Sequence, residues 1–450
     1  MIGTVTAVLK HIKADLAQIL DALTMLALWR AAGYQWRPRV LDPVMTVHLF
    51  LLQVLHGNTA CSHLPHLAAQ RFTASALCQA RTRLPLMVWE PWLRRTTAAV
   101  DQTSQDEGRW RGHRTFLVDG SSCSMPDTPE LQEHFGQPGG QRPGCGFPVA
   151  HLLALLPAGT GFLMAVVADP WHTHDMARVT ALHPTLRSGD VLVGDRACCS
   201  FAHLALLRQQ DLPALFRVHQ KHMVDVTPSR PHTGAKAPRA QKGVPRSRWL
   251  RQLGGTDQLV EWVKPLPPPA WMTPELFASF PETLCVRALR SRVAQAGFRT
   301  QTVTLVTTLL EVDAYPADAL ADLDGRRWQV ETNRRHLKQT LGLDVLHYQR
   351  FAGVMKELTV FALVYNLVRV VMLEAAKRQG VALERLSFVD ALRWLSTARP
   401  GEPLPPWVGN PHRPDRVEPR AVKRRPKPYP LLMKPRREAR NALIQQRVGA

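Results

Sequence analysis

Apolar residues recur every three or four positions near the start of the chain, which is the spacing of one face of a helix. The first such face is formed by Leu9, Ile12, Leu16, Ile19, Leu23 and Leu26. Pro38 and Pro43 interrupt this pattern, and a second apolar helix is predicted from Val44 to Leu55. Shorter helices are predicted at 62–71 and 73–83. Residues 1–110 are therefore predicted to be a helical N-terminal region.

Polar residues on the last of these helices admit two interpretations. They are Ser75, Gln79, Arg81 and Arg83. One interpretation is a DNA reader of the helix-turn-helix kind. The other is a plain helical bundle with a solvated basic face, and the two explain these residues equally well. We assign residues 1–110 as a helical DNA-binding region and keep the plain bundle as its alternative.

The pattern changes at residue 114 from helical periodicity to short apolar runs. Strand-like runs are predicted at 114–119, 149–156, 161–168, 190–195 and 212–218, with helices at 174–186 and 201–209. The runs at 149–156 and 161–168 flank a Pro-Ala-Gly-Thr turn and predict a hairpin. This order predicts a mixed α/β core whose first part spans residues 111–218.

Residues 219–302 interrupt that core. The stretch from 226 to 256 is rich in Pro and Gly and has seven Lys or Arg and no acidic residue, so it is predicted to be a basic loop. Apolar alternation returns at 258–263, 283–290 and 300–309, which predicts a β-rich basic insertion.

Helical patterns resume at 316–342 and at 354–379, so residues 303–399 are predicted to hold the second part of the core and C-terminal helices. Residues 400–450 form a Pro-rich basic tail. Residues 411–450 alone contain twelve Lys or Arg against three Asp or Glu, a net charge of +9.

The formal charge of the whole 450-residue chain is +21, which favours a polyanionic partner, with nucleic acid ahead of an anionic membrane surface. The best membrane-span candidate, Leu358 to Leu373, is interrupted by Asn366 and Arg369. The N-terminus lacks the pattern of a signal peptide. We therefore expect neither secretion nor insertion into a membrane. The seven cysteines form no CxxC pair, which leaves a zinc ribbon unsupported and predicts reduced thiols in a cytosol.

Two carboxylates stand out by their context. Asp119 and Asp195 each end a short apolar run, and each is next to a glycine. A buried strand with a carboxylate at its C-terminal end delivers that group to the rim of a sheet, where open α/β folds place their sites. Either aspartate alone is better explained as the start of a turn or as a helix cap, because Asp-Gly and Gly-Asp are ordinary turn signals.

A third carboxylate, Glu331, lies among basic residues. In a continuous helix Arg327, Glu331, Arg334 or Arg335, and Lys338 would share one stripe. An exposed face with Arg–Glu pairing is one interpretation. The other is a metal-binding glutamate flanked by cations that hold phosphates. Cleaving or joining a phosphodiester needs an activated oxygen and charge relief at the leaving oxygen, and two Mg²⁺ ions held by carboxylates supply both.

These segments resemble the bacterial insertion-sequence transposases with a DDE triad and a ribonuclease-H-like core. The stretch LVDGSSCSMPDTPELQEHFG at 117–136 is similar to the family's first-Asp motif, and VLVGDRACCS at 191–200 to its second. RRWQVETNRRHLKQTLGLDVLH at 326–347 resembles the Glu motif. The resemblance covers roughly 70–440 and is to the subgroup with a β-rich insertion and a Y-x2-R-x3-E-x6-K motif.

The resemblance implies that Asp119, Asp195 and Glu331 are the catalytic residues and the ligands of two Mg²⁺ ions, for which Mn²⁺ can substitute. Arg327 and Lys338 fall on the family's DNA-contacting positions, and we add Arg334 and Arg335 as DNA-binding residues. The family's tyrosine should stand at position 324, but this chain has Asp324, which would repel a phosphate unless it points away. Tyr315 and Tyr348 are too distant along the chain to replace it. Trp262 and Trp271 are candidates for the insertion's base-stacking aromatic, although packing in a β unit explains each of them more simply.

The implied function is cut-and-paste DNA transposition. Strands are cleaved at terminal inverted repeats, and the freed 3′-OH is transferred into target DNA. The partners would be double-stranded DNA and a second copy of the chain, in a bacterial cytoplasm at the nucleoid. The alternatives are a catalytically inactive protein that binds transposon ends, and a nuclease that cuts without joining.

Overall fold

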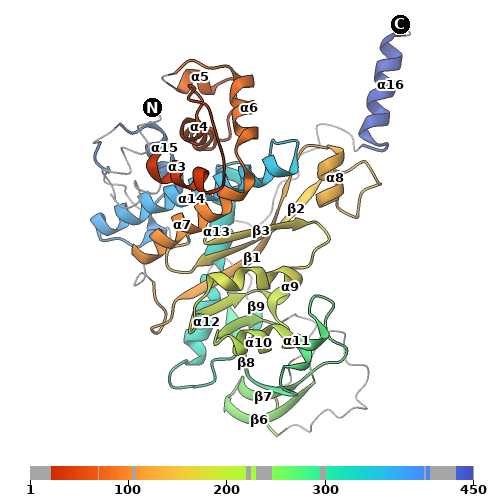
Figure 1. Cartoon of the computed structure of the whole chain (residues 1–450). Coiled ribbons are helices and arrows are strands. Elements are labelled where there is room, and N and C mark those ends of the chain that lie inside the picture. The colour runs from red at the N-terminus through yellow and green to blue at the C-terminus, as the bar shows by residue number, and fades with distance from the viewer. Residues whose placement is uncertain are drawn as a thin grey trace.

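The computed structural model describes residues 22–68, 70–103, 108–218, 224, 226–229, 246–293, 301–399, 402–405 and 432–448. A single mixed sheet runs through the molecule, and most of the helices gather beside it at one end (Figure 1). The chain is thus a mixed α/β protein. The predicted helix at residues 9–26 lies partly outside the described residues.

Nine strands form the sheet in the order β3-β2-β1-β4-β5-β9-β8-β7-β6. The strands of the first half are β1 (Thr115–Ser124), β2 (Val149–Pro157), β3 (Ala165–Pro170), β4 (Val191–Gly194) and β5 (Ala214–Arg217). β1 is antiparallel to β2 and parallel to β4, and β4 is parallel to β5. The first four residues of β1 and all four of β4 are buried, which explains why these strands appear in the sequence as unbroken apolar runs.

The second half of the sheet consists of β6 (Ser247–Gly254), β7 (Asp257–Val263), β8 (Thr283–Val293) and β9 (Gln301–Thr307). These strands are antiparallel neighbours, and β9 also pairs with β5, so the insertion extends the sheet of the core. A helix of five residues, α11 (Pro274–Ala278), precedes β8.

The basic-loop prediction for 226–256 is wrong for its last part, because residues Ser247–Gly254 form the edge strand β6. Its basic side chains did not suggest a strand. An edge strand tolerates them because one side pairs and the other faces solvent, where charge also hinders pairing with another chain. Arg248 on β6 forms an ion pair of 2.6 Å with Glu261 on β7.

The helical end of the molecule is built around α14 (Phe351–Gln379), a helix of 29 residues. It packs against α4 (Pro43–Leu55), α7 (Trp89–Thr103) and α15 (Phe388–Thr397). By length and composition α14 could span a membrane, but 89% of its apolar window is buried within the protein. The side chains of Asn366 and Arg369, which interrupt the apolar run, bind backbone groups of Leu163 and Thr160 between β2 and β3.

The remaining N-terminal helices are α3 (Ala22–Ala31), α5 (Leu64–Leu67) and α6 (Ala74–Arg83). Of the four polar residues proposed as a DNA-reading face on α6, Arg81 is buried. Its guanidinium lies over the rings of Phe50 and Tyr348, at 4.8 and 5.1 Å from their centroids. Arg81 therefore ties α6 to α4 and to the segment before α14 and cannot contact a base from this position. Ser75, Gln79 and Arg83 are exposed.

The helix predicted over 316–342 is broken into parts. α12 (Ala317–Arg326) ends next to Arg327, α13 (Trp328–Arg335) follows, and a π turn occupies His336–Thr340. Arg327 itself has helical backbone angles (φ −55°, ψ −27°), and Arg327, Glu331 and Arg334 line one cleft, as a shared stripe predicts. Lys338 lies in the π turn and does not line that cleft. The other helices are α8 (Pro129–Phe135), α9 (Asp175–Arg178), α10 (Phe201–Gln209) and α16 (Arg436–Val448), which projects from the molecule near the C-terminus (Figure 1).

Candidate active site

The register of the parallel pair β1–β4 brings two aspartates together. Val118 pairs with Gly194 at the end of the ladder, so Asp119 and Asp195 are the next residue on each strand. Asp119 does not end its strand, as the sequence suggested, because β1 continues to Ser124 along β2. It lies where the parallel pairing stops. A Cβ at Gly194 would come within 2.9 Å of Val118 Cγ1 and 3.1 Å of Phe216, so only glycine fits here.

Asp195 also has the capping role that the sequence left open. Its Oδ1 accepts a hydrogen bond of 2.8 Å from the backbone N–H of Ala197, which caps a short 3-10 turn at Arg196–Cys198. This bond fixes the carboxylate at the mouth of β4. A second hydrogen bond stabilises this turn: His203 Nδ1 on α10 lies 2.7 Å from the backbone oxygen of Cys198.

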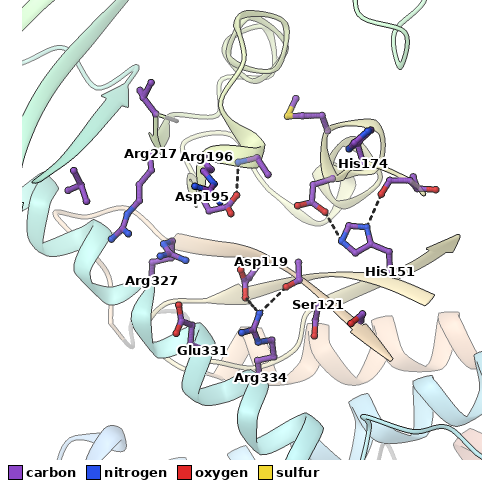
Figure 2. A pocket seen from close by; sticks show the side chains of 18 of the residues that line it. Asp119, Ser121, His151, His174, Asp195, Arg196, Arg217, Arg327, Glu331 and Arg334 are labelled. Atoms are coloured by element: carbon purple, nitrogen blue, oxygen red, sulfur yellow. Dashed lines mark hydrogen bonds and ion pairs between the residues drawn. The ribbon is translucent and has the colours of Figure 1, made fainter. Parts of the chain in front are cut away.

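Glu331 on α13 completes the acidic group. It lines the same cleft as Asp119 and Asp195, and Figure 2 shows the three carboxylates arriving from β1, the end of β4 and the helix. The volume of this cleft is about 1570 Å³. Pockets for small ligands typically measure about 300–1,000 Å³, so the cleft is large enough for a polymer segment.

Arg334 lies against Asp119. Its Nη1 is 3.4 Å from Asp119 Oδ2 and donates to the backbone oxygen of Gly120 at 3.2 Å. Burial raises the pKa of Asp119 to about 6; Arg334 and Arg327 oppose this shift, while Asp195 and Glu331 add to it. Asp119 therefore lies in a partly desolvated position within electrostatic reach of the other two acids.

Basic side chains line the cleft around the acids, namely Arg196, Arg217, Arg290, Arg327 and Arg334. Arg327 Nε is buried and has no hydrogen-bond partner among the described residues. The cleft thus contains two of the four cations named as DNA-binding residues, Arg327 and Arg334. The other two lie elsewhere: Arg335 is exposed and does not line the cleft, and Lys338 pairs with Asp344 at 3.0 Å.

The aspartate at the expected tyrosine position points away from the cleft. Asp324 is buried and accepts from Arg217 Nε at 2.8 Å and from Arg217 Nη2 at 2.5 Å. It therefore presents no exposed negative charge to a phosphate. Tyr315 bonds to His113, and Tyr348 is packed under Arg81, so neither tyrosine lines the cleft.

Several cleft residues were not singled out from the sequence. Arg217 ends β5 and Arg290 lies within β8, and neither belongs to a sequence motif. For Arg217 the only signal is position: β5 is parallel to β4, so Arg217 reaches the same sheet edge as Asp195. Trp271 of the insertion lines the cleft, whereas Trp262 is buried.

A histidine–carboxylate pair occupies the wall of the cleft beside Asp119. His151 Nε2 lies 2.9 Å from Asp175 Oδ1, and Nδ1 lies 2.9 Å from the carbonyl of Thr173, which raises the pKa of His151. A Cβ on Gly120 would be 3.2 Å from Asp175, so this glycine leaves room for the pair. His172 and His174, which follow β3, line the cleft together with Asp175.

The chemistry of the three acids fits a hard divalent cation, because carboxylate oxygens are the ligands that Mg²⁺ and Mn²⁺ prefer. The raised pKa of Asp119 is also what an added positive charge at this point would relieve. Among the described residues, no three His, Cys, Asp or Glu side chains are close enough to hold one ion between them. The acids therefore face a common space from three elements without forming a closed cage.

Acids and arginines thus meet at a mixed sheet, in a cleft large enough for a polymer segment. Comparison of the chain with known protein families identifies its class as a transposase. The family model described as "Transposase DDE domain" matches residues 110–367, more than half of the chain. The chain belongs to this family, whose function is DNA transposition.

Two relatives from Escherichia coli (strain K12) are similar to this chain. Transposase InsG for insertion sequence element IS4 is 24% identical over 388 residues, which cover 80% of this chain and 78% of the relative. Putative transposase InsZ is 29% identical over 144 residues, which cover 30% of this chain and 46% of the relative. Among solved structures, a piggyBac transposase synaptic complex with hairpin DNA, determined by cryo-EM, matches with a TM-score of 0.44 and 10% identity over 86% of this chain and 79% of that one, a likeness too low to support an argument.

Proposed function

We propose that the chain is a metal-dependent DNA transposase that cleaves DNA at the terminal inverted repeats of an insertion sequence and transfers the freed 3′ ends into target DNA. The observation that carries the proposal is the placement of Asp119, Asp195 and Glu331 around one arginine-lined cleft. The β3-β2-β1-β4-β5 part of the sheet would be a ribonuclease-H-like core. Residues 219–302 would be the insertion, 1–110 a DNA-binding region and 400–450 a basic tail.

The three carboxylates would hold two Mg²⁺ ions, or Mn²⁺ in their place, which lower the pKa of an attacking water and relieve charge on the leaving oxygen. In the first step a water oxygen attacks phosphorus at the element's end. The bond between phosphorus and the 3′ oxygen breaks, and a 3′-OH and a 5′-phosphate result. In the second step that 3′-OH attacks a target phosphodiester, so a new P–O bond forms and the target's own 3′ oxygen leaves.

The protein's own groups orient the DNA for both steps. Arg327 has a buried Nε without a partner among the described residues, and a phosphate oxygen would satisfy it. Arg334 would exchange part of its contact with Asp119 for a phosphate when a cation neutralises that acid. Trp271 would offer a flat surface to an unstacked base at the cleft wall.

The implied partners are double-stranded DNA and a second copy of the chain, because two ends must be held during transfer. The net charge of +21 supports a DNA partner. We place the activity in the bacterial cytoplasm, at the nucleoid where the element resides.

Mobilisation in cells tests the proposal. A resistance marker flanked by the gene's own terminal repeats is supplied with the chain or with Asp195→Asn, and insertions at new sites are sequenced. Insertions bracketed by short direct duplications with the unaltered chain only are expected. Binding to the repeats without any insertion would favour the inactive end-binding alternative, and cut ends that never join would favour a nuclease.

A further inference from the structure

We infer that Asp324 is a positioning residue, which locks Arg217 so that the unengaged edge of the guanidinium faces a DNA phosphate in the cleft. The inference rests on the proposed function for the identity of the polyanion in the cleft. It also assigns a role to the one residue that departs from the family's motif. Asp324 would not contact the phosphate itself but would orient Arg217, which does.

The geometry of the pair is that of a fixed fork. Arg217 Nε lies 2.8 Å from Asp324 Oδ1 and 3.0 Å from Oδ2, and Nη2 lies 2.5 Å from Oδ2. The Asp324 side chain is only 2% exposed, whereas that of Arg217 is 26% exposed and lines the cleft. The acid is therefore at the buried end of the pair and the arginine at the open end. In Figure 2 the Arg217 side chain reaches toward the side of the cleft that Arg327 occupies.

The hydrogen bonds to Asp324 leave part of the guanidinium unused. Both bonding nitrogens, Nε and Nη2, lie on one edge, and Nη1 has no hydrogen-bond partner in the part of the chain that the structure describes. An arginine has five N–H donors in a rigid plane, so fixing one edge also fixes where the others point. An arginine that is already oriented loses less side-chain entropy when it binds a phosphate than a free arginine does.

A second pair in the molecule shows what a purely structural fork is like. Arg287 on β8 engages Asp257 on β7 in the same way, with Nε to Oδ1 at 2.9 Å and Nη2 to Oδ2 at 2.5 Å. Its Nη1, however, donates to the carbonyl of Tyr315 at 2.6 Å, and the Arg287 side chain is fully buried. Neither Arg287 nor Asp257 lines the cleft. The two pairs differ because Arg217 lines the cleft and has donors that Asp324 does not engage, which a structural role does not require.

The experiment measures binding and turnover separately. The chain and its variants are titrated with a labelled duplex of the gene's terminal repeat in EDTA at several salt concentrations, and strand cleavage is then followed in Mg²⁺. For Arg217→Gln we expect the slope of log affinity against log salt to fall by about one, as when one phosphate contact is lost. Arg217→Lys keeps the charge but loses the fork, so it should keep the slope and lose about tenfold or more in cleavage turnover.

Asp324→Asn separates positioning from charge. It adds one positive charge to the cleft, so a role through charge alone predicts tighter binding with a steeper salt slope. Positioning predicts no gain in affinity and a loss of about tenfold or more in turnover. Asp257→Asn is the matched control: it lowers the melting temperature and leaves the salt slope unchanged.

The inference is overturned if Arg217→Gln keeps the salt slope of the unaltered chain, or if Asp324→Asn binds more tightly and cleaves normally. Failure of the unaltered chain to cleave would count against the proposed function, whereas the salt slope, which needs no cleavage, would still decide the role of Arg217. If Asp324→Asn does not fold, Arg217→Lys and Arg217→Gln, which leave the buried acid in place, decide between the outcomes.

Discussion

Val118 and Gly194 face each other as the last pair of the parallel ladder between β1 and β4, and this pairing sets Asp119 beside Asp195. A methyl group at position 194 would meet Val118, Cys198 and Phe216 at 2.9 to 3.1 Å. Gly194→Ala should therefore push the two strands apart, and with them the two acids.

We predict that Gly194→Ala lowers the free energy of unfolding by about 1–3 kcal/mol, the usual cost of overpacking a core. The rate of strand cleavage should fall by more than the loss of folded protein explains, because Asp195 directly follows Gly194 and would move with it. Urea unfolding and strand cleavage measure the two effects. Gly255→Ala is the control, since a Cβ there has no neighbour within 4 Å. Equal stability of the two variants would contradict the packing argument.

Asp119→Asn should stabilise the metal-free protein at neutral pH. The folded pKa of Asp119 is raised to about 6, above that of an unfolded aspartate, so the folded state loses stability as pH rises through 6. Asparagine removes this penalty, which is at most roughly 3 kcal/mol at about 1.36 kcal/mol per unit of pKa. The measurement is urea unfolding in EDTA at pH 7.5 and pH 4.5.

The stabilisation by Asp119→Asn should be present at pH 7.5 and shrink toward pH 4.5, where the wild-type carboxyl is protonated as well. Asp390→Asn is the control, because the Asp390 side chain is 54% exposed. A variant less stable than wild type at pH 7.5 would show that Asp119 is a structural group and not a strained functional one.

Acid should loosen the support beneath Asp195. His203 Nδ1 donates to the Cys198 carbonyl, so its Nε2 must accept from His183 Nε2, at 3.1 Å. Burial lowers the pKa of His203 to about 3 and that of His183 to about 4. The unfolded chain therefore takes up protons first, and stability falls as pH drops below about 6.5, by as much as ~1.4 kcal/mol per pH unit for each histidine.

The loss of stability with acid is measured by urea unfolding between pH 7.5 and pH 5. His203→Gln removes one titrating group, so this variant should start less stable and lose less over the range. His172→Gln, at an exposed position, should follow the wild-type curve. Parallel curves for wild type and His203→Gln would contradict the assignment of the acid sensitivity to this pair.

Two arginines of the same motif should behave differently. Arg327 lines the cleft, with Nε buried, whereas Arg335 is exposed outside it. We predict that Arg327→Gln lowers cleavage turnover at least about tenfold, and that Arg335→Gln changes at most the salt dependence of binding, by a slope of about one. The two variants are measured side by side on one duplex, and equal losses of turnover would contradict the placement of Arg327 in the site.

The sequence was informative where a local pattern determines structure. The unbroken apolar runs before Asp119 and Asp195 predicted buried strands, and both runs are strands in one mixed sheet. The helix predicted at 201–209 is observed as Phe201–Gln209. Such segments are predictable because burial on both faces requires apolar residues at consecutive positions.

Partners distant in the sequence could not be predicted. Arg217 and Asp324 are 107 positions apart, and neither residue alone indicates the other. The strand β6 was hidden by its basic side chains, because edge strands tolerate charge. The break at Arg327 was missed although Asp324-Gly325 just before it is a turn signal, because buried apolar residues continue at helical spacing on both sides of it.

Strand cleavage by the acid variants tests the central claim most directly, namely that Asp119, Asp195 and Glu331 act as one metal-dependent site. A labelled duplex with the terminal repeat is incubated in Mg²⁺ or EDTA with wild type, Asp119→Asn, Asp195→Asn, Glu331→Gln and the exposed-site control Asp390→Asn. The account predicts cleavage at the repeat boundary by wild type and Asp390→Asn in Mg²⁺ only, and none by the other three, although each still binds. Cleavage retained by any of the three folded acid variants, or cleavage in EDTA, would contradict it.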